Sequence, residues 1–172
     1  MTRRSAIAIL LSAAAMAVFA PSASAACPGQ GNATASAAAQ ERAMLCLVNR
    51  ARANYGLSPL AAPSSLAWAA ARKSVDVLRC DDFSHQACGR DSEYWVERSG
   101  YEGCAGENLA YGYGRTATPR YIFRLWMNSS GHRENILGAY PYDDIGIGLQ
   151  VGALGGARNV HVWTQVFGIR GC

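Results

Sequence analysis

The sequence predicts an α+β fold held together by disulfides. Helical periodicity dominates early in the chain, over residues 39–55 and 66–78. Strand patterns come late, over residues 145–151 and 160–167, where apolar residues alternate with glycine or other residues. Helices followed by antiparallel strands favour a sheet that is covered by helices. The chain has 172 residues, a length that predicts one domain with a substantial hydrophobic core.

The first 25 residues have the pattern of a signal peptide. Arg3 and Arg4 give a charged start, residues 7–20 form an apolar run, and residues 23–25 read Ala-Ser-Ala, a cleavage site of the A-x-A kind. The apolar run is shorter than the roughly 20 residues that span a bilayer. No second hydrophobic span follows it. We therefore expect a secreted, extracellular protein with no transmembrane segment.

Composition argues against several classes of partner and cofactor. Cleavage after residue 25 removes two arginines and no acidic residue, so the net charge falls from +4 to +2. No basic stripe with interleaved aromatic residues occurs, and nucleic acid is not an expected partner. The chain has no glycine-rich phosphate loop, no G-x-S-x-G elbow and no H-E-x-x-H motif. We expect a monomer with no nucleotide cofactor. We favour a binding protein over an enzyme.

The N-terminal half is predicted to contain an arm and two helices. Residues 26–38 are rich in glycine, alanine and serine, as in a linker or arm. The helix over 39–55 ends at Gly56. Ser64 or Ser65 is expected to cap the helix that follows. The folded domain is predicted to extend over residues 39–172.

The C-terminal half is predicted to begin with an irregular, polar segment, residues 80–103, in which residues 93–98 favour a short helix. Residues 105–112 are predicted to form a strand. The remaining expected elements are a helix from Thr118-Pro119 to Asn128, a helix capped by Ser129 that runs through Leu137, and a final hairpin whose turn covers residues 152–158.

All six cysteines follow the predicted cleavage site, and an even number in an exported chain indicates three disulfides. A zinc site is disfavoured because the chain has no C-x-x-C pair. Fifteen pairings of six cysteines exist. We favour the pairs Cys27–Cys46, Cys80–Cys88 and Cys104–Cys172, with Cys88–Cys104 as the main competing pair.

A single carboxylate, Glu107, lies in a run of glycine, small apolar and aromatic residues over 105–112. An unpaired buried carboxylate is costly, so Glu107 must find a cation, a donor or water. His85 precedes this run and His132 follows it, and we expect the three stretches to surround one cleft. Histidine with glutamate suits a divalent metal site, with zinc as the first choice, or general acid–base chemistry. The alternative for each is a structural role, and strand alternation favours that role for His161.

The chain resembles the CAP superfamily (cysteine-rich secretory proteins, antigen 5 and pathogenesis-related 1, also called SCP domains) in its bacterial secreted branch. The resemblance covers about residues 40–170, in family order. The matching stretches are Leu47-Val48-Asn49-Arg50-Ala51-Arg52, Phe83-Ser84-His85, Gly106-Glu107-Asn108-Leu109-Ala110, residues 126–137, Ile145-Gly146-Ile147-Gly148, and Trp163-Thr164-Gln165-Val166-Phe167-Gly168.

The resemblance implies an α-β-α sandwich with a central antiparallel sheet and a surface cleft. The cleft of eukaryotic members carries two histidines and two glutamates and binds metal. His85 and Glu107 match the first of each, whereas Ser129 and Val162 stand at the second positions. His161 lies one place from the second histidine position. The bacterial Gly-His-Arg element would supply His132 instead, giving His85, Glu107 and His132 as candidate metal ligands or catalytic residues.

The resemblance implies several functions. We favour an extracellular binding module whose His/Glu cleft holds a divalent metal or a small ligand, lipids included. One alternative is a metal- or acid/base-assisted hydrolase that acts on peptide or cell-wall substrates. The other is a non-catalytic structural exoprotein. The expected partners are therefore a small-molecule or lipid ligand, or a component of the cell wall or extracellular space.

Overall fold

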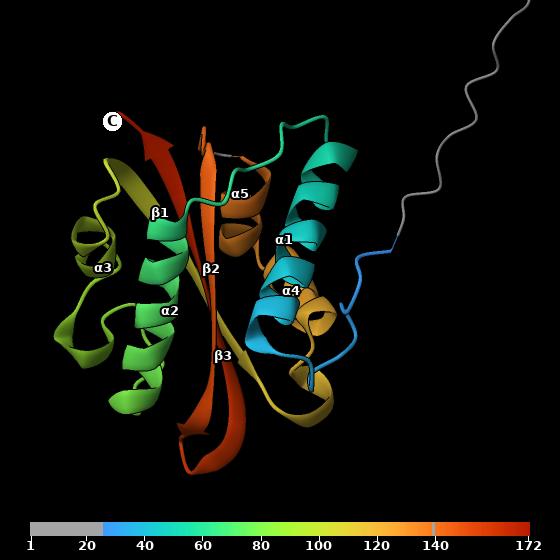
Figure 1. Cartoon of the computed structure of the whole chain (residues 1–172), viewed down its shortest axis with the longest axis vertical. Helices are drawn as coiled ribbons and strands as arrows, with labels where there is room; N and C mark the ends of the chain where they lie inside the picture. Colours follow the sequence, from blue (N-terminus) through green and yellow to red (C-terminus); the bar gives the residue numbers. More distant parts are fainter. Residues whose placement is uncertain (1–25, 139) are drawn as a thin grey trace, which may run out of the picture.

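In the computed structural model of the chain, the described residues are 26–138 and 140–172. The predicted signal peptide lies outside them. A three-stranded antiparallel sheet with the order β1-β3-β2 forms the centre. Its strands are β1 (Gly103–Gly112), β2 (Asp144–Leu154) and β3 (Ala157–Arg170). Helices flank the sheet on both sides, which confirms the α+β class and the expected sandwich (Figure 1).

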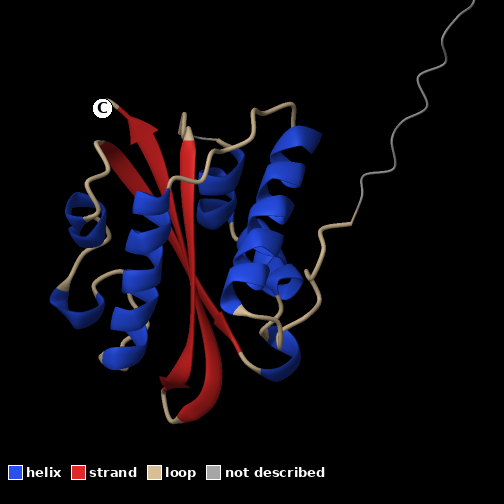
Figure 2. Cartoon of the chain, in the orientation of Figure 1, coloured by secondary structure: helices blue, strands red, loops and turns tan. Residues whose placement is uncertain are grey.

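The helices divide into two groups, one on each face of the sheet (Figure 2). One face is covered by α2 (Ser64–Arg79) and the short α3 (Tyr94–Arg98). The other carries α1 (Ala37–Asn54), α4 (Pro119–Asn128) and α5 (Ser130–Leu137). Two 3-10 turns complete the described elements, η1 (Ala87–Gly89) and η2 (Gly114–Thr116).

The central strand β3 has apolar side chains on both faces, which is why both faces are covered. Trp163 and Phe167 pack in the core beneath α1, α4 and α5. Val162 and Val166, on the alternate face, pack against α2 and its neighbours. Because successive side chains of a strand point in opposite directions, one strand supplies two separate cores.

Local signals account for several helix starts. Ser36 Oγ accepts a hydrogen bond from the Ala39 amide at 3.3 Å and caps α1. Thr118 caps α4 as predicted, with Pro119 at the first helical position. The prediction that Ser64 or Ser65 caps α2 is wrong. Pro63 is the cap residue, and both serines lie inside the first turn. Pro63 has an extended backbone, with φ of −66° and ψ of 143°, and the helix begins after it without a side-chain acceptor at the cap.

The hairpin between β2 and β3 is tighter than expected. The strands continue to Leu154 and resume at Ala157, so the turn is Gly155-Gly156 and not the predicted 152–158. Both glycines have positive φ, 56° and 79°, the conformation that two-residue hairpin turns require. A register irregularity between Gly152 and Leu154 absorbs the extra residue.

Three disulfides connect the elements, and they are the favoured pairs. Cys27–Cys46 ties the N-terminal arm to α1. Cys80–Cys88 closes the loop that carries residues 83–85. Cys104–Cys172 joins the start of β1 to the C-terminus. Within the described residues, no helix is both long and apolar enough to cross a membrane.

Candidate functional site

A groove of about 550 Å³ opens where β1 ends, and it brings together the three stretches that the sequence marked. The C-terminal half of β1 lines it on one side, and α4 with the start of α5 lines it on the other. Phe83 closes one flank. The lining residues are Phe83, Leu109, Ala110, Tyr111, Gly112, Tyr113, Thr116, Tyr121, Leu125, Trp126, Ser129 and His132.

Beside the groove, His85 and Glu107 form a close pair. His85 Nδ1 lies 2.7 Å from Glu107 Oε1. The Glu107 side chain is 2% exposed, whereas the His85 side chain is 57% exposed. The buried carboxylate thus has a solvent-facing imidazole as its partner, as its position in an apolar run required. The second oxygen, Oε2, is buried and has no hydrogen-bond partner among the described residues.

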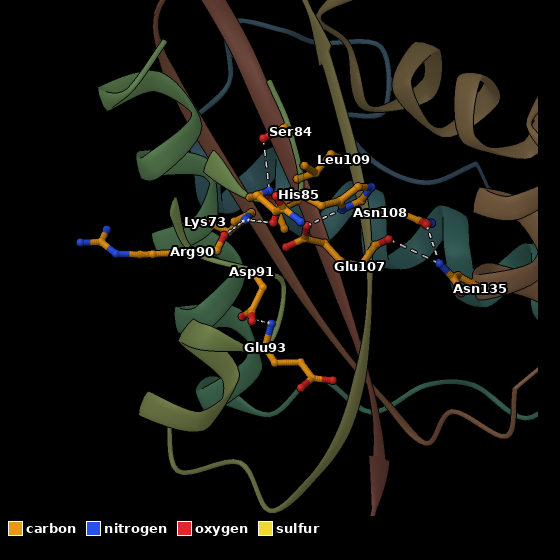
Figure 3. A network of polar contacts seen from close by, with 12 residues as sticks. Lys73, Ser84, His85, Arg90, Asp91, Glu93, Glu107, Asn108, Leu109 and Asn135 are labelled. Carbon is orange, nitrogen blue, oxygen red and sulfur yellow. Dashed lines mark hydrogen bonds and ion pairs between the residues drawn. The ribbon is translucent and has the colours of Figure 1, made fainter. Parts of the chain in front are cut away.

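A buried cation, Lys73, holds the backbone of the loop that carries His85. Its Nζ donates to the backbone carbonyl of His85 and, at 2.9 Å, to that of Arg90. Lys73 is 1% exposed, and burial lowers the pKa of its ammonium group, while Glu107 opposes this shift more than any other carboxylate does. The Lys73, His85 and Glu107 side chains gather in one place in Figure 3. Lys73 therefore fixes the loop that presents His85.

The sequence analysis missed Lys73, although the sequence contains a signal for it. The inward face of α2 repeats small and apolar residues at helical spacing, and Lys73 falls on that face. A lysine among Leu66, Ala69, Ala70 and Val77 needs buried partners, because an unpaired buried ammonium is costly. The partners are loop carbonyls far away in sequence, which only the fold supplies.

The pKa values of His85 and His132 are shifted in opposite directions. The hydrogen bond to Glu107 raises the pKa of His85 above 6.5, more than partial burial lowers it. Burial lowers the pKa of His132, and the nearby His85 lowers it further. At neutral pH His132 is therefore neutral, while His85 holds its proton more tightly. Paired groups with separated pKa values are the usual basis for acid and base roles.

The structure does not bring His132 into contact with Glu107. Glu107 faces the α2 side of β1, where His85 meets it. Asn108 faces the opposite side, and its Nδ2 donates to the His132 carbonyl at 3.1 Å. The backbone of His132 thus lies on the face of β1 opposite to Glu107, while His132 also lines the groove. Asn135 holds this arrangement by donating to Asn108 Oδ1 at 2.8 Å.

The three predicted metal ligands do not gather at one point in the described part of the chain. Over residues 26–138 and 140–172, no three His, Cys, Asp or Glu side chains are grouped so that they could hold a metal. Only His85 and Glu107 are adjacent, whereas catalytic zinc sites use three protein ligands. We therefore derive no chemical step through a metal ion.

The residues at the family's second histidine and second glutamate positions lie in different surroundings. Val162 is fully buried in the core on the α2 side of the sheet. His161 lies on the other face, is 9% exposed and does not line the groove. Its Nδ1 is buried and, within the described part of the chain, has no partner. Ser129 does line the groove, next to His132.

No activated nucleophile is evident beside these histidines. Ser84 Oγ donates to Asp82 at 3.0 Å, and no hydrogen bond joins it to His85. All six cysteines are in disulfides. What the arrangement offers chemically is one exposed imidazole backed by a buried carboxylate, next to a largely apolar groove.

Comparisons with known proteins agree with the fold and the motifs. The family model described as "CAP: Cysteine-rich secretory protein family" matches residues 45–167. The uncharacterized protein YkwD of Bacillus subtilis is 34% identical over 139 residues, which is 79% of this chain and 49% of that protein. The chain thus spans about half the length of this relative.

Solved structures share the fold at lower identity. An outer surface protein of Borrelia burgdorferi has a TM-score of 0.65 at 17% identity, covering 79% of this chain and 96% of that one. An extracellular SCP-domain protein of Bacillus anthracis has a TM-score of 0.62 at 23% identity, covering 79% and 44%. A cysteine-rich secretory protein of Staphylococcus aureus has a TM-score of 0.59 at 20% identity, covering 78% and 39%. Since the family model covers most of the chain, the chain belongs to the CAP family of cysteine-rich secretory proteins.

Proposed function

We propose that this chain is an extracellular binding domain whose groove holds an apolar ligand or the apolar segment of a larger one. The lining of the groove carries the proposal. It is mostly aromatic and aliphatic, contains no acidic residue, lysine or arginine, and has His132 as its titratable imidazole. A neutral, apolar lining with a few polar groups is the usual composition of a ligand site.

The size and exposure of the groove support this function. Its volume of about 550 Å³ lies within the roughly 300–1,000 Å³ of small-molecule sites. Tyr111, Tyr113 and Leu125 are 43%, 58% and 41% exposed along its rim. Large apolar side chains grouped at one opening commonly mark an interaction site, because a bound ligand would remove them from water.

An extracellular location fits both the cross-links and the relatives. Three disulfides in a chain of this size are typical of an oxidising compartment. Two of the similar structures are described as an outer surface protein and an extracellular protein. The predicted signal peptide would direct the chain there.

A fluorescent fatty-acid probe tests the binding function. We expect saturable binding to the mature protein, and at least tenfold weaker binding to Leu125→Asp, because that change places a charge in the apolar lining. Tyr55→Asp is the matched control, since Tyr55 is 65% exposed at the end of α1 and does not line the groove. Equal binding by all three proteins, or none by the wild type, would reject the proposal.

The His85–Glu107 pair favours a second candidate, a hydrolase in which His85 activates water. An imidazole oriented by a carboxylate is the arrangement of a general base. Turnover of peptide or cell-wall substrates that disappears in a folded Glu107→Gln variant would support this function. Turnover that survives the substitution would exclude the pair from catalysis. A zinc ion at His85 stays a prediction of the family resemblance, and calorimetry of wild type against His85→Ala measures it.

A further inference from the structure

We infer that the occupant of the groove is an extended peptide that pairs with the open edge of β1 and places an acidic side chain near the exposed arginines of η2 and α4. The inference rests on the proposed binding function and names the class of ligand. It follows from the position of the groove, from the direction of the β1 backbone groups and from the distribution of charge.

The groove runs along the edge of β1 and not over one of its faces. Four consecutive strand residues, 109–112, line it, as does Tyr113 directly after the strand. Successive side chains of a strand point to opposite faces, so a cavity over one face would touch only every second residue. A cavity that meets four strand residues in a row lies beside the strand. The other edge of β1 is paired with β3, so the groove occupies the free edge.

The hydrogen-bond pattern of the sheet shows which β1 residues point their backbone N–H and C=O groups toward the groove. The Leu149 amide donates to Glu41 Oε1 at 2.9 Å, so it points away from β3. Its partner Trp163 must then bond to β1, where it pairs with Ala110. Backbone groups alternate along an antiparallel strand. The N–H and C=O groups of Leu109 and Tyr111 therefore point to the free edge.

Two of the edge carbonyls are already capped by side chains. Trp126 Nε1 donates to the Leu109 carbonyl at 3.1 Å, which independently confirms that this carbonyl points outward. Asn135 Nδ2 reaches the Glu107 carbonyl at 3.5 Å. No such cap covers Tyr111 among the described residues, and Tyr111 is 43% exposed. One residue thus presents a donor and an acceptor together, the pair that a peptide uses when it adds to a sheet edge.

The two flanks of the groove carry opposite charges, so a peptide with both acidic and basic groups could bind there. Residues 113–138 contain four arginines and one acidic residue, Glu134. Arg115 and Arg124 are exposed, are the sequence neighbours of the groove-lining Thr116 and Leu125, and make no ion pair within the described part of the chain. We call these two residues the arginine wall. The acidic flank is Asp81-Asp82, next to Phe83.

These features favour a peptide over the other classes of ligand. A fatty acid has no backbone donor for the Tyr111 carbonyl. A flat membrane surface cannot enter a groove to reach a strand edge. A peptide supplies alternating backbone groups, an apolar side chain for the groove and a carboxylate for the arginine wall.

Selection from a randomised octapeptide library against the full mature protein tests the inference. We expect enriched peptides with an acidic residue next to an aromatic or aliphatic one. Because the Leu109 and Glu107 carbonyls are already capped, methylating single backbone nitrogens of the best binder should weaken binding at least tenfold at the nitrogen that donates to the Tyr111 carbonyl and little at the other positions. An unpatterned response, or no enrichment, would overturn the inference.

Charge reversal supplies the matched variants. Arg115→Glu with Arg124→Glu should weaken the selected acidic peptide at least tenfold, whereas Arg98→Glu on α3 should leave its affinity unchanged. Equal affinity in both would refute the arginine wall.

Vesicles of phosphatidylglycerol are the comparison for a lipid surface, and binding to vesicles with no selected peptide would overturn the inference in favour of a membrane. If no peptide is enriched while the fatty-acid probe still binds, the peptide inference fails and the binding function stands; if the probe also fails, both fail.

Discussion

At the scale of the residue, the site is governed by one buried carboxylate and the cations around it. Glu107 Oε1 accepts from an exposed imidazole, and Lys73 contributes positive potential from beneath. Each partner offsets part of the cost of burying the charge. The result is a pair whose protonation responds to pH near neutrality, because one partner is a histidine.

The three histidines should titrate in a defined order. We expect the pKa of His85 to lie above 6.5, because Glu107 stabilises its charged form, and those of His132 and His161 to lie below it, because burial disfavours theirs. NMR titration of the imidazole signals measures all three values. Glu107→Gln should lower the pKa of His85; an unchanged value would show that the pair does not form in solution.

The same shift has a consequence for stability. A group whose pKa is raised on folding binds more protons in the folded state, so the stability that it contributes is lost as pH rises. The contribution of His85 should be fully present below pH 6.5 and should disappear as pH rises through its higher folded value. The difference in free energy of unfolding between wild type and His85→Gln is the measurement, and it should be larger at pH 5.5 than at pH 8.5.

At the scale of the element, two glycines set the distance between α2 and β2. A Cβ at Gly148 would lie 2.3 Å from the Ala71 backbone nitrogen, and one at Gly146 would lie 2.1 Å from the Leu66 backbone. No side chain fits between a strand and a helix backbone at that separation. In β2, glycine alternates with isoleucine and leucine because the backbone of α2 packs closely against the face on which the glycines lie.

Gly148→Ala should be strongly destabilising. The added methyl group meets helix backbone, which cannot move aside as a side chain does, so we expect a loss of roughly 3 kcal/mol in the free energy of unfolding. Gly131→Ala in α5 is the matched control, because nothing lies within 4 Å of its Cβ position. That change should be neutral or stabilising by up to about 1 kcal/mol. Urea unfolding followed by circular dichroism compares them, and equal effects would contradict the packing argument.

At the scale of the whole molecule, the disulfides restrain very different lengths of chain. Cys104–Cys172 spans 68 residues and joins the start of β1 to a residue just after β3, at one end of the β1–β3 pair, whereas Cys80–Cys88 spans 8 residues. In the chain-entropy model, a cross-link stabilises more when it closes a longer loop in the unfolded state. The long-range bond should therefore dominate global stability, and the short one should act on the His85 loop.

Removing the bonds one at a time tests this division. Cys104→Ser with Cys172→Ser should cost about 4 kcal/mol, and Cys80→Ser with Cys88→Ser about 2.5 kcal/mol. Cys104 and Cys172 are both exposed, so their replacement leaves no cavity that would confuse the comparison. Thermal unfolding of the two double variants gives the order. A larger loss for the short loop would mean that local structure and not chain entropy sets the effect.

The sequence by itself determined the parts of this protein that depend on local pattern. Period and capping residues located the helices and strands to within a few residues, the even number of cysteines indicated three disulfides, and ordered motifs indicated the family. The pairing of His85 with Glu107 was expected for a physical reason, since a carboxylate in an apolar run needs a partner. Local errors, such as the long hairpin turn, arose where two glycines permit a tighter turn than composition indicates.

Only the tertiary structure decided what lies around that pair. It placed the His132 backbone on the face of β1 opposite to Glu107, because Asn108 and not Glu107 points toward α5. It brought Lys73 beneath a loop that lies 12 residues away in sequence, and it left the Tyr111 edge open beside α4. Contacts between distant segments depend on the register of β1 on β3 and on the packing of the helices, and a shift of one residue would exchange the two faces. The sequence therefore located the site near Glu107, and the fold determined that an open strand edge lies next to it.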